Sequence, residues 1–189
     1  VVLKYNSDSG LTLNVYSDGT AGVATINVST PSVTFSPKTV TFFAKSPKTI
    51  TASVNNPVLN VGANSKAVKA VAVDSNGNAW TGGLYIVAAT AADALVGGSA
   101  TAPVECTYDT TKLAYYCPIT TLIAGTANFK VVDQSLDLDG VYAAADSAAS
   151  SDAVSVTASA GVPSTVKLAC DKATYAPFEK AIITVTPLD

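Results

Sequence analysis

The sequence predicts an all-β protein built from β-sandwich modules, and three observations carry this prediction. Ala, Val, Thr and Ser supply 96 of the 189 residues, and the β-branched Val and Thr suit the pleated surface of a sheet. Short runs alternate apolar with small polar residues, which is the pattern of a half-buried strand. Turn signals such as Asp18-Gly19 and Asn76-Gly77 separate these runs, at the spacing of about 8–12 residues that is typical of a sandwich.

Strands are expected, in chain order, wherever such a run occurs. The runs are residues 1–5, 39–42, 49–54, 68–73, 127–131 and 154–157, a run that starts at Thr165, and residues 182–186. Two Ala-rich stretches, 88–95 and 142–149, are expected to form short helical turns. From the period-2 pattern, the side chains predicted to be mostly buried are Ile50, Ala52, Val68, Val71, Val73, Phe129 and Val131.

Internal repeats indicate a tandem array. Residues 47–54 align with residues 163–170 at an offset of 116. Residues 21–29 align without a gap with residues 124–132, and four of those nine positions are identical. These two pairs of aligned segments alternate along the chain, which implies one repeating unit of about 115 residues. That length suits an immunoglobulin-like sandwich, in which about 100 residues form two sheets.

The repeats predict three parts. Residues 1–46 are expected to be the last strands of one module plus a connector, residues 47–160 one complete module, and residues 161–189 the first strands of the next. Asp74 and Asp189 then lie at corresponding positions, at an offset of 115. Because both ends of the sequence fall in or beside predicted strands, we expect the chain to be a segment of a longer secreted polypeptide.

Two short motifs resemble bacterial Ig-like repeats of the invasin and intimin type. Residues 179–189 resemble the second strand of such a repeat, and residues 71–78 resemble the Asp-x-x-Gly-Asn turn that follows this strand. These repeats stack in tandem in adhesins and in surface-layer proteins. The resemblance therefore implies a cell-surface location and a scaffold role, without implying a ligand. Residues 134–151 are longer than the family pattern, and residues 1–46 match it only by their last strand.

Composition argues against several function classes. The chain has no His, so it can form neither a Ser-His-Asp triad nor an imidazole metal ligand. Its net charge is −3 and it has no Arg, which does not suit phosphate contacts along a nucleic acid. No apolar stretch reaches the roughly 18 residues of a membrane span. The only Trp, Trp80, is expected in the core or at the flank of a sheet rather than as a sugar platform. We therefore expect no enzymatic activity, no nucleic-acid partner and no membrane-spanning segment.

Cys106 and Cys117 are expected to form a disulfide across a β-hairpin that turns at Thr111-Lys112. The register of that hairpin places on one apolar face the pairs Cys106 with Cys117, Tyr108 with Tyr115, and Val104 with Ile119. The bridge would stabilise the fold by about 3 kcal/mol in the chain-entropy model. The alternative is two buried thiols, and Cys170 is left over within this segment. Because disulfides persist in oxidising surroundings, the prediction is an extracellular protein.

Two sets of oxygen-bearing side chains are calcium candidates: Asp74, Asn76 and Asn78 in one loop, and Asp133, Asp137 and Asp139 in another. The first set has the i, i+2, i+4 spacing of calcium loops but lacks their bidentate Glu. Its Asn-Gly pair also predicts a hairpin turn by itself, and a turn is the preferred interpretation. For the second set, solvated loop acids are preferred over calcium. We therefore expect no resident cofactor, with calcium as the alternative.

Two function classes remain. The first is a structural extracellular scaffold, a repeating segment of a surface-layer or surface-filament protein that self-associates into a lattice or filament. Low charge and an Ala/Thr/Ser/Val surface favour this class, because such surfaces can pair with little charge to desolvate. The alternative is the stalk of a cell-surface adhesin, whose contacts with cell wall or host are made by other parts of the chain. A short connector at residues 159–163, stiffened by Pro163, predicts modules stacked end to end as a rod.

Overall fold

β-Strands make up almost all the regular structure of the computed structural model, which describes residues 2–6, 10–29, 31–134, 140–161 and 165–188. These residues form 15 strands and two short 3₁₀ helices, with no α-helix among them. The prediction of an all-β fold is therefore confirmed. The 3₁₀ helices, η1 (Asp93–Leu95) and η2 (Ala144–Asp146), lie in the Ala-rich stretches where helical turns are predicted. No helix in the described ranges is long and apolar enough to cross a membrane.

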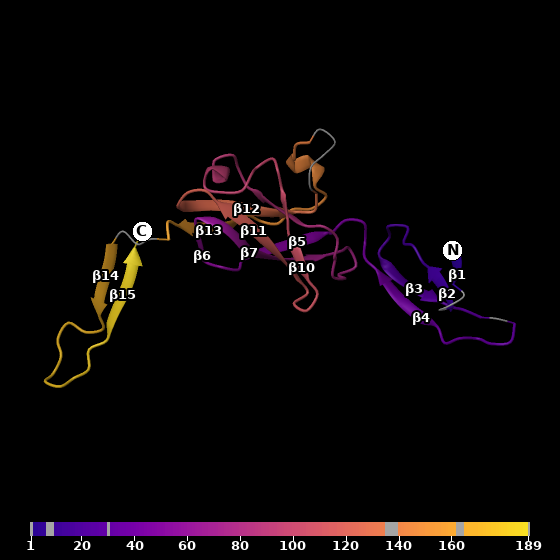
Figure 1. The fold of residues 1–189 in the computed structure, drawn as a ribbon, viewed down its shortest axis with the longest axis horizontal. Coiled ribbons are helices and arrows are strands. Elements are labelled where there is room, and N and C mark those ends of the chain that lie inside the picture. The colour runs from indigo at the N-terminus through magenta and orange to yellow at the C-terminus, as the bar shows by residue number, and fades with distance from the viewer. Residues whose placement is uncertain (1, 7–9, 30, 135–139, 162–164, 189) are drawn as a thin grey trace.

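Two sheets form a sandwich at the centre of the molecule (Figure 1). One sheet has the strand order β10 (Thr107–Asp109), β11 (Ala114–Thr121), β7 (Gly62–Val73), β5 (Thr49–Val54). The other has the order β6 (Val58–Asn60), β13 (Val154–Ser159), β12 (Gly125–Val132), β8 (Tyr85–Ala88), β9 (Val104–Glu105). All described pairs in these two sheets are antiparallel except β6 with β13, which is parallel.

Both sheets contribute to one hydrophobic cluster. Strand β7 adds Val68, Ala70 and Ala72, and strand β12 adds Ala127, Phe129 and Val131. Each set alternates along its strand, because successive side chains of a strand point to opposite faces of the sheet. Burial of each large apolar side chain contributes about 1.5–3 kcal/mol, so this cluster is the main source of stability of the sandwich.

The predicted core is partly confirmed. Ile50, Val68, Phe129 and Val131 are at most 4% exposed, while Ala52 and Val73 are half-buried. The prediction for Val71 is wrong, since its side chain is 40% exposed. Val71 lies three residues after Val68, so in a regular strand the two side chains point to opposite faces.

The predicted hairpin register is right within the hairpin and wrong before it. Tyr108 pairs with Tyr115, as predicted. Val104, however, pairs with Ile86 of β8 and not with Ile119. The chain leaves the five-stranded sheet after β9 and enters the four-stranded sheet at β10, so the hairpin register cannot extend back beyond Cys106.

Three hairpins flank the sandwich. Strand β1 (Val2–Asn6) pairs with β2 (Gly10–Asn14), and β3 (Gly22–Ile26) pairs with β4 (Lys38–Phe42). At the other end, β14 (Thr165–Cys170) pairs with β15 (Ile183–Leu188). Figure 1 shows the first two hairpins, the sandwich and the last hairpin following one another along the long axis of the molecule. Pro163 and Asp189 lie outside the described residues.

The C-terminal hairpin repeats the pairing of the first two long strands of the sandwich. Thr49 of β5 pairs with Val73 of β7. The aligned residues Thr165 and Leu188 pair with each other in β14 and β15. Because the pairing is antiparallel in both hairpins, all the remaining residue pairs of β5 and β7 also correspond to pairs of β14 and β15. Residues 47–54 and 163–170 therefore share their strand pairing as well as their sequence pattern.

The other pair of aligned segments, residues 21–29 and 124–132, also shares its strand pairing. Gly22 of β3 pairs with Phe42 of β4. Gly125, which aligns with Gly22, pairs with Ala158, which follows Phe42 at the offset of 116. The hairpin before the sandwich thus has the register of the last two long strands of the sandwich. Phe42, the last residue of β4, is followed by Thr49, the first residue of β5. The aligned residues Ala158 and Thr165 have the same separation, although β13 continues one residue further, to Ser159.

Candidate functional site

The Asp74 loop forms a tight hairpin turn directly after β7. Asp74 is a buried acid, with a side chain that is 2% exposed. Its Oδ1 accepts hydrogen bonds from the backbone N–H groups of Asn76 and Asn78, each at 2.9 Å. Gly77 has a φ of +78°, a left-handed conformation that favours glycine. The turn reverses the chain and carries it on to Trp80.

This turn and Trp80 hold the segment that enters the sandwich from the preceding hairpin. The backbone N–H of Ala44 donates to Asp74 Oδ2 at 3.3 Å, and Trp80 Nε1 donates to the Ala44 carbonyl at 2.8 Å. Asn76 Nδ2 also donates to the carbonyl of Ala21 at 3.2 Å. The Phe43 ring meets the indole edge-on, with 5.9 Å between ring centroids. Residues 43 and 44 are therefore clamped against the end of the sandwich, and we call this set of contacts the junction clamp.

Trp80 connects the junction clamp to the core. Its side chain is 5% exposed and belongs to the main hydrophobic cluster, as the sequence-based interpretation of a core position expects. The indole covers Gly82, where a Cβ would lie 2.3 Å from the ring. Any larger residue at position 82 must displace the indole. The Gly82-Gly83 pair thus serves close packing as well as a turn.

The hydrogen bonds of the Asp74 loop match the turn interpretation. Both carboxylate oxygens of Asp74 already face N–H donors, including Nδ2 of Asn78 at 3.3 Å. The Asn76 amide is turned towards Ala21. The Asp74 carboxylate is thus engaged by N–H groups of its own turn and of Ala44, as a structural turn requires.

The second calcium candidate is only partly described. Asp133 Oδ1 accepts a hydrogen bond from the backbone N–H of Ala149 at 3.1 Å. Asp137 and Asp139 lie outside the described residues. Within the described ranges, no group of three or more His, Cys, Asp or Glu side chains could hold a metal ion.

Asp74 has a lowered pKa. Burial raises the pKa of this carboxyl, but the N–H groups of Asn78, Asn76 and Ala44 together outweigh burial and hold the pKa below its ordinary value of 3.8. A carboxyl with a depressed pKa in the folded state stabilises that state at neutral pH. This stabilisation begins to fall below the unfolded-state pKa and is lost as the pH drops through the folded-state pKa.

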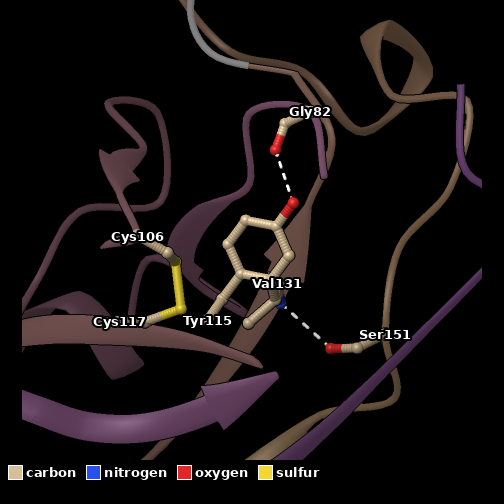
Figure 2. The surroundings of a disulfide bond; sticks show 6 residues. All are labelled: Gly82, Cys106, Tyr115, Cys117, Val131 and Ser151. Atoms are coloured by element: carbon tan, nitrogen blue, oxygen red, sulfur yellow. Dashed lines mark hydrogen bonds between the residues drawn. A yellow bond between two sulfur atoms is a disulfide. The ribbon is translucent and has the colours of Figure 1, made fainter. Parts of the chain in front are cut away.

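Cys106 lies where the chain passes from β9 of one sheet to β10 of the other, and Figure 2 shows its bond to Cys117. Cys106 and Cys117 form a disulfide, and both are buried, at 4% and 0% exposure. Next to Cys117, the hydroxyl of Tyr115 donates to the carbonyls of Gly82 and Trp80, at 2.6 and 3.1 Å. Burial raises the pKa of Tyr115, so the phenol remains a neutral donor. The bridge ties the start of β10 to β11, while Tyr115 anchors β11 to the segment that follows Trp80.

Two buried hydroxyls have roles that sequence reasoning missed. Ser151 Oγ accepts the backbone N–H of Val131 at 3.0 Å and donates to the carbonyl of Asp152 at 2.8 Å. Thr121 Oγ1 accepts the N–H of Gly62 at 3.1 Å and donates to the carbonyl of Asn60 at 2.7 Å. Val131 lies 20 residues from Ser151, and Gly62 and Asn60 lie 59 and 61 residues from Thr121, so no local sequence pattern signals these bonds.

Comparisons with known proteins give little beyond this geometry. No protein-family model matches the chain, and no curated protein does. Among solved structures, the chain is similar to one described as the structure of surface layer protein SbsC, domains 4-9, with 16% identity and a TM-score of 0.36. The match covers 100% of this chain and 26% of that one, so the chain spans about a quarter of its length. At this TM-score the likeness carries no argument about function.

Proposed function

We propose that the chain is a non-catalytic segment of an extracellular scaffold, in which Ig-like modules follow one another as a stiff rod. The surface-layer or surface-filament class fits this role best. Residues 47–160 would be one module, residues 1–46 the end of the preceding module with its connector, and residues 161–189 the start of the following one. The observation that carries the proposal is the recurrence of both hairpin registers on either side of the sandwich.

The junction clamp supports the stiffness of the rod. A connector that is free in solution would let neighbouring modules hinge, as flexible linkers do. Here Ala44 is bonded through both its N–H and its carbonyl, and Pro47 at the start of the sandwich is buried. Pro also fixes the backbone φ angle. These restraints leave the connector few conformations, so the preceding module is held in one orientation.

An adhesin stalk is the second candidate, and the same modules would serve it. Both candidates need a stiff rod and differ in self-association: a lattice or filament segment pairs with its own copies, whereas a stalk segment stays monomeric. The low charge of the chain, 13% Asp, Glu, Lys and Arg, favours self-association because little charge must be desolvated.

Pulsed electron paramagnetic resonance on the 189-residue chain tests the stiffness directly. Spin labels at Thr25→Cys on β3 and Ser155→Cys on β13, both exposed, report the distance across the junction in a Cys170→Ser background. We expect one narrow distance distribution. Asp74→Ala removes the acceptor for Ala44 and should broaden it, while circular dichroism shows that the strands remain.

Acid should act like the Asp74→Ala variant. Because the pKa of Asp74 is depressed in the folded state, the distribution should stay narrow at neutral pH and broaden only below about pH 4. Asp74→Ala should remove this pH dependence. A broad distribution at neutral pH in the unaltered chain would contradict a stiff junction, whatever the acid response.

A further inference from the structure

The two sheets of the sandwich have four edge strands, and one of them differs from the rest. Strand β9 has two residues and includes Glu105, β10 has three and includes Asp109, and β6 has three. Strand β5 has six residues, Thr-Ile-Thr-Ala-Ser-Val, with no charge and a regular pairing with β7. Proteins usually protect edges with short strands, charges, prolines or bulges. Strand β5 carries none of these protections.

The backbone of β5 presents hydrogen-bonding groups along its open side. The N–H of Asn55 donates to the Ala67 carbonyl of β7 at 2.9 Å. Hydrogen-bonded residues alternate in an antiparallel pair, so Ser53 and Thr51 also bond to β7. The intervening residues Ala52 and Val54 then direct their N–H and carbonyl groups away from β7. No strand in the described part of the chain pairs with that side.

A second copy of the same strand matches this edge. In an antiparallel pair centred on Ala52, the Ala52 residues of the two copies face each other and Thr51 faces Ser53. Thr51 and Ser53 are exposed, and Thr–Ser pairs across strands are favourable. No charged side chain from β5 opposes another. The aligned strand β14 carries Lys167 in place of Thr51, and Lys is a residue that discourages edge pairing. Identical β5 edges are therefore better matched to each other than to β14.

We propose that β5 is an interaction surface at which two copies of this chain join edge to edge, in antiparallel register centred on Ala52. The joined four-stranded sheets would form one continuous sheet of eight strands across a two-fold axis. This inference rests on the proposed scaffold function, for which it supplies the lateral contact between neighbouring rods. Stiffness along the rod and pairing across it remain separate properties.

Disulfide trapping tests the register. In a Cys170→Ser background, which removes the exposed thiol, the double variant Thr51→Cys/Ser53→Cys places each new thiol opposite its partner in a non-hydrogen-bonded pair. The Cα atoms of such a pair are about 4.5 Å apart, which permits a disulfide. The double variant should form a covalent dimer under mild oxidation. Each single variant should not, because Thr51 does not face Thr51 in this register.

Adding a charge to the β5 edge gives an independent measure. Thr51→Lys should weaken dimerisation of the 189-residue chain roughly tenfold in sedimentation equilibrium. Thr126→Lys makes the same change at an exposed position of β12, an interior strand of the other sheet, and should leave dimerisation unchanged. Equal trapping of the two single variants, a monomer at all concentrations, or dimers that resist Thr51→Lys would each overturn the proposal. A narrow spin-label distribution together with any of these results would leave the stiff rod standing.

Discussion

Replacing Trp80 with alanine is expected to lower the free energy of unfolding of the sandwich by about 3–5 kcal/mol, the range for large aromatic-to-alanine changes in cores. The side chain is 5% exposed and contacts both the core and the connector. Its removal leaves a cavity beside Gly82 and takes away the donor to the Ala44 carbonyl. Urea unfolding followed by circular dichroism measures the loss, because this chain has only one Trp to serve as a fluorescence probe.

A Trp80→Phe variant separates the two roles of this residue. Phe keeps most of the buried ring but has no N–H, so its cost in stability should be close to the roughly 1 kcal/mol of one hydrogen bond plus some lost packing. The spin-label distance across the junction should nevertheless broaden in both variants. If Trp80→Phe leaves that distribution narrow, the indole hydrogen bond to Ala44 does not restrain the connector.

Removing the disulfide is the second change with a large expected effect. Cys106→Ala/Cys117→Ala should lower the free energy of unfolding by about 3 kcal/mol, the chain-entropy value for a loop of this length. The bridge restrains the chain where it passes from one sheet to the other, between β9 and β10. The sandwich should still fold, because its cluster draws on both sheets. Thermal unfolding with and without reducing agent provides the measurement.

Cys170→Ala is the matched control for the disulfide. Cys170 is exposed and has no disulfide partner in the structure, so its removal should leave the melting temperature unchanged. Loss of all β-structure in the Cys106→Ala/Cys117→Ala variant at room temperature would contradict an independent core. An unchanged melting temperature in that variant would show that the bridge adds no stability.

Local patterns were readable from the sequence, and pairings between distant segments were not. The hairpin around the disulfide was predictable because its register depends only on residues between Cys106 and Cys117. Strand β8 was missed because Ile86, Val87 and Ala88 are all buried in succession, so the strand shows no alternation. Val71 is exposed because it lies an odd number of residues from the buried Val68 in the same strand, so the two side chains point to opposite faces of the sheet.

The junction clamp was readable only in part. The Asn-Gly signal correctly indicated a turn at Asp74, and Trp80 was correctly expected in the core or at a sheet flank. Neither observation could show that both residues bond to Ala44, which precedes them by 30 and 36 residues. The repeat was readable, because two different segments, residues 47–54 and residues 21–29, each recur later in the chain and in the same order. Only the structure shows that the strand registers recur together with the repeated sequence.

The central claim is that modules of this kind repeat at a fixed spacing and orientation. Arrays of two, three and four copies of residues 47–162, joined head to tail, reproduce the offset of 116 and place Ala160 where Ala44 stands in the first junction. Small-angle X-ray scattering on these arrays should give a maximum dimension that grows by the same increment with each added copy. A maximum dimension that grows only about as the square root of the number of copies, as in a freely hinged chain, would contradict the stiff tandem scaffold.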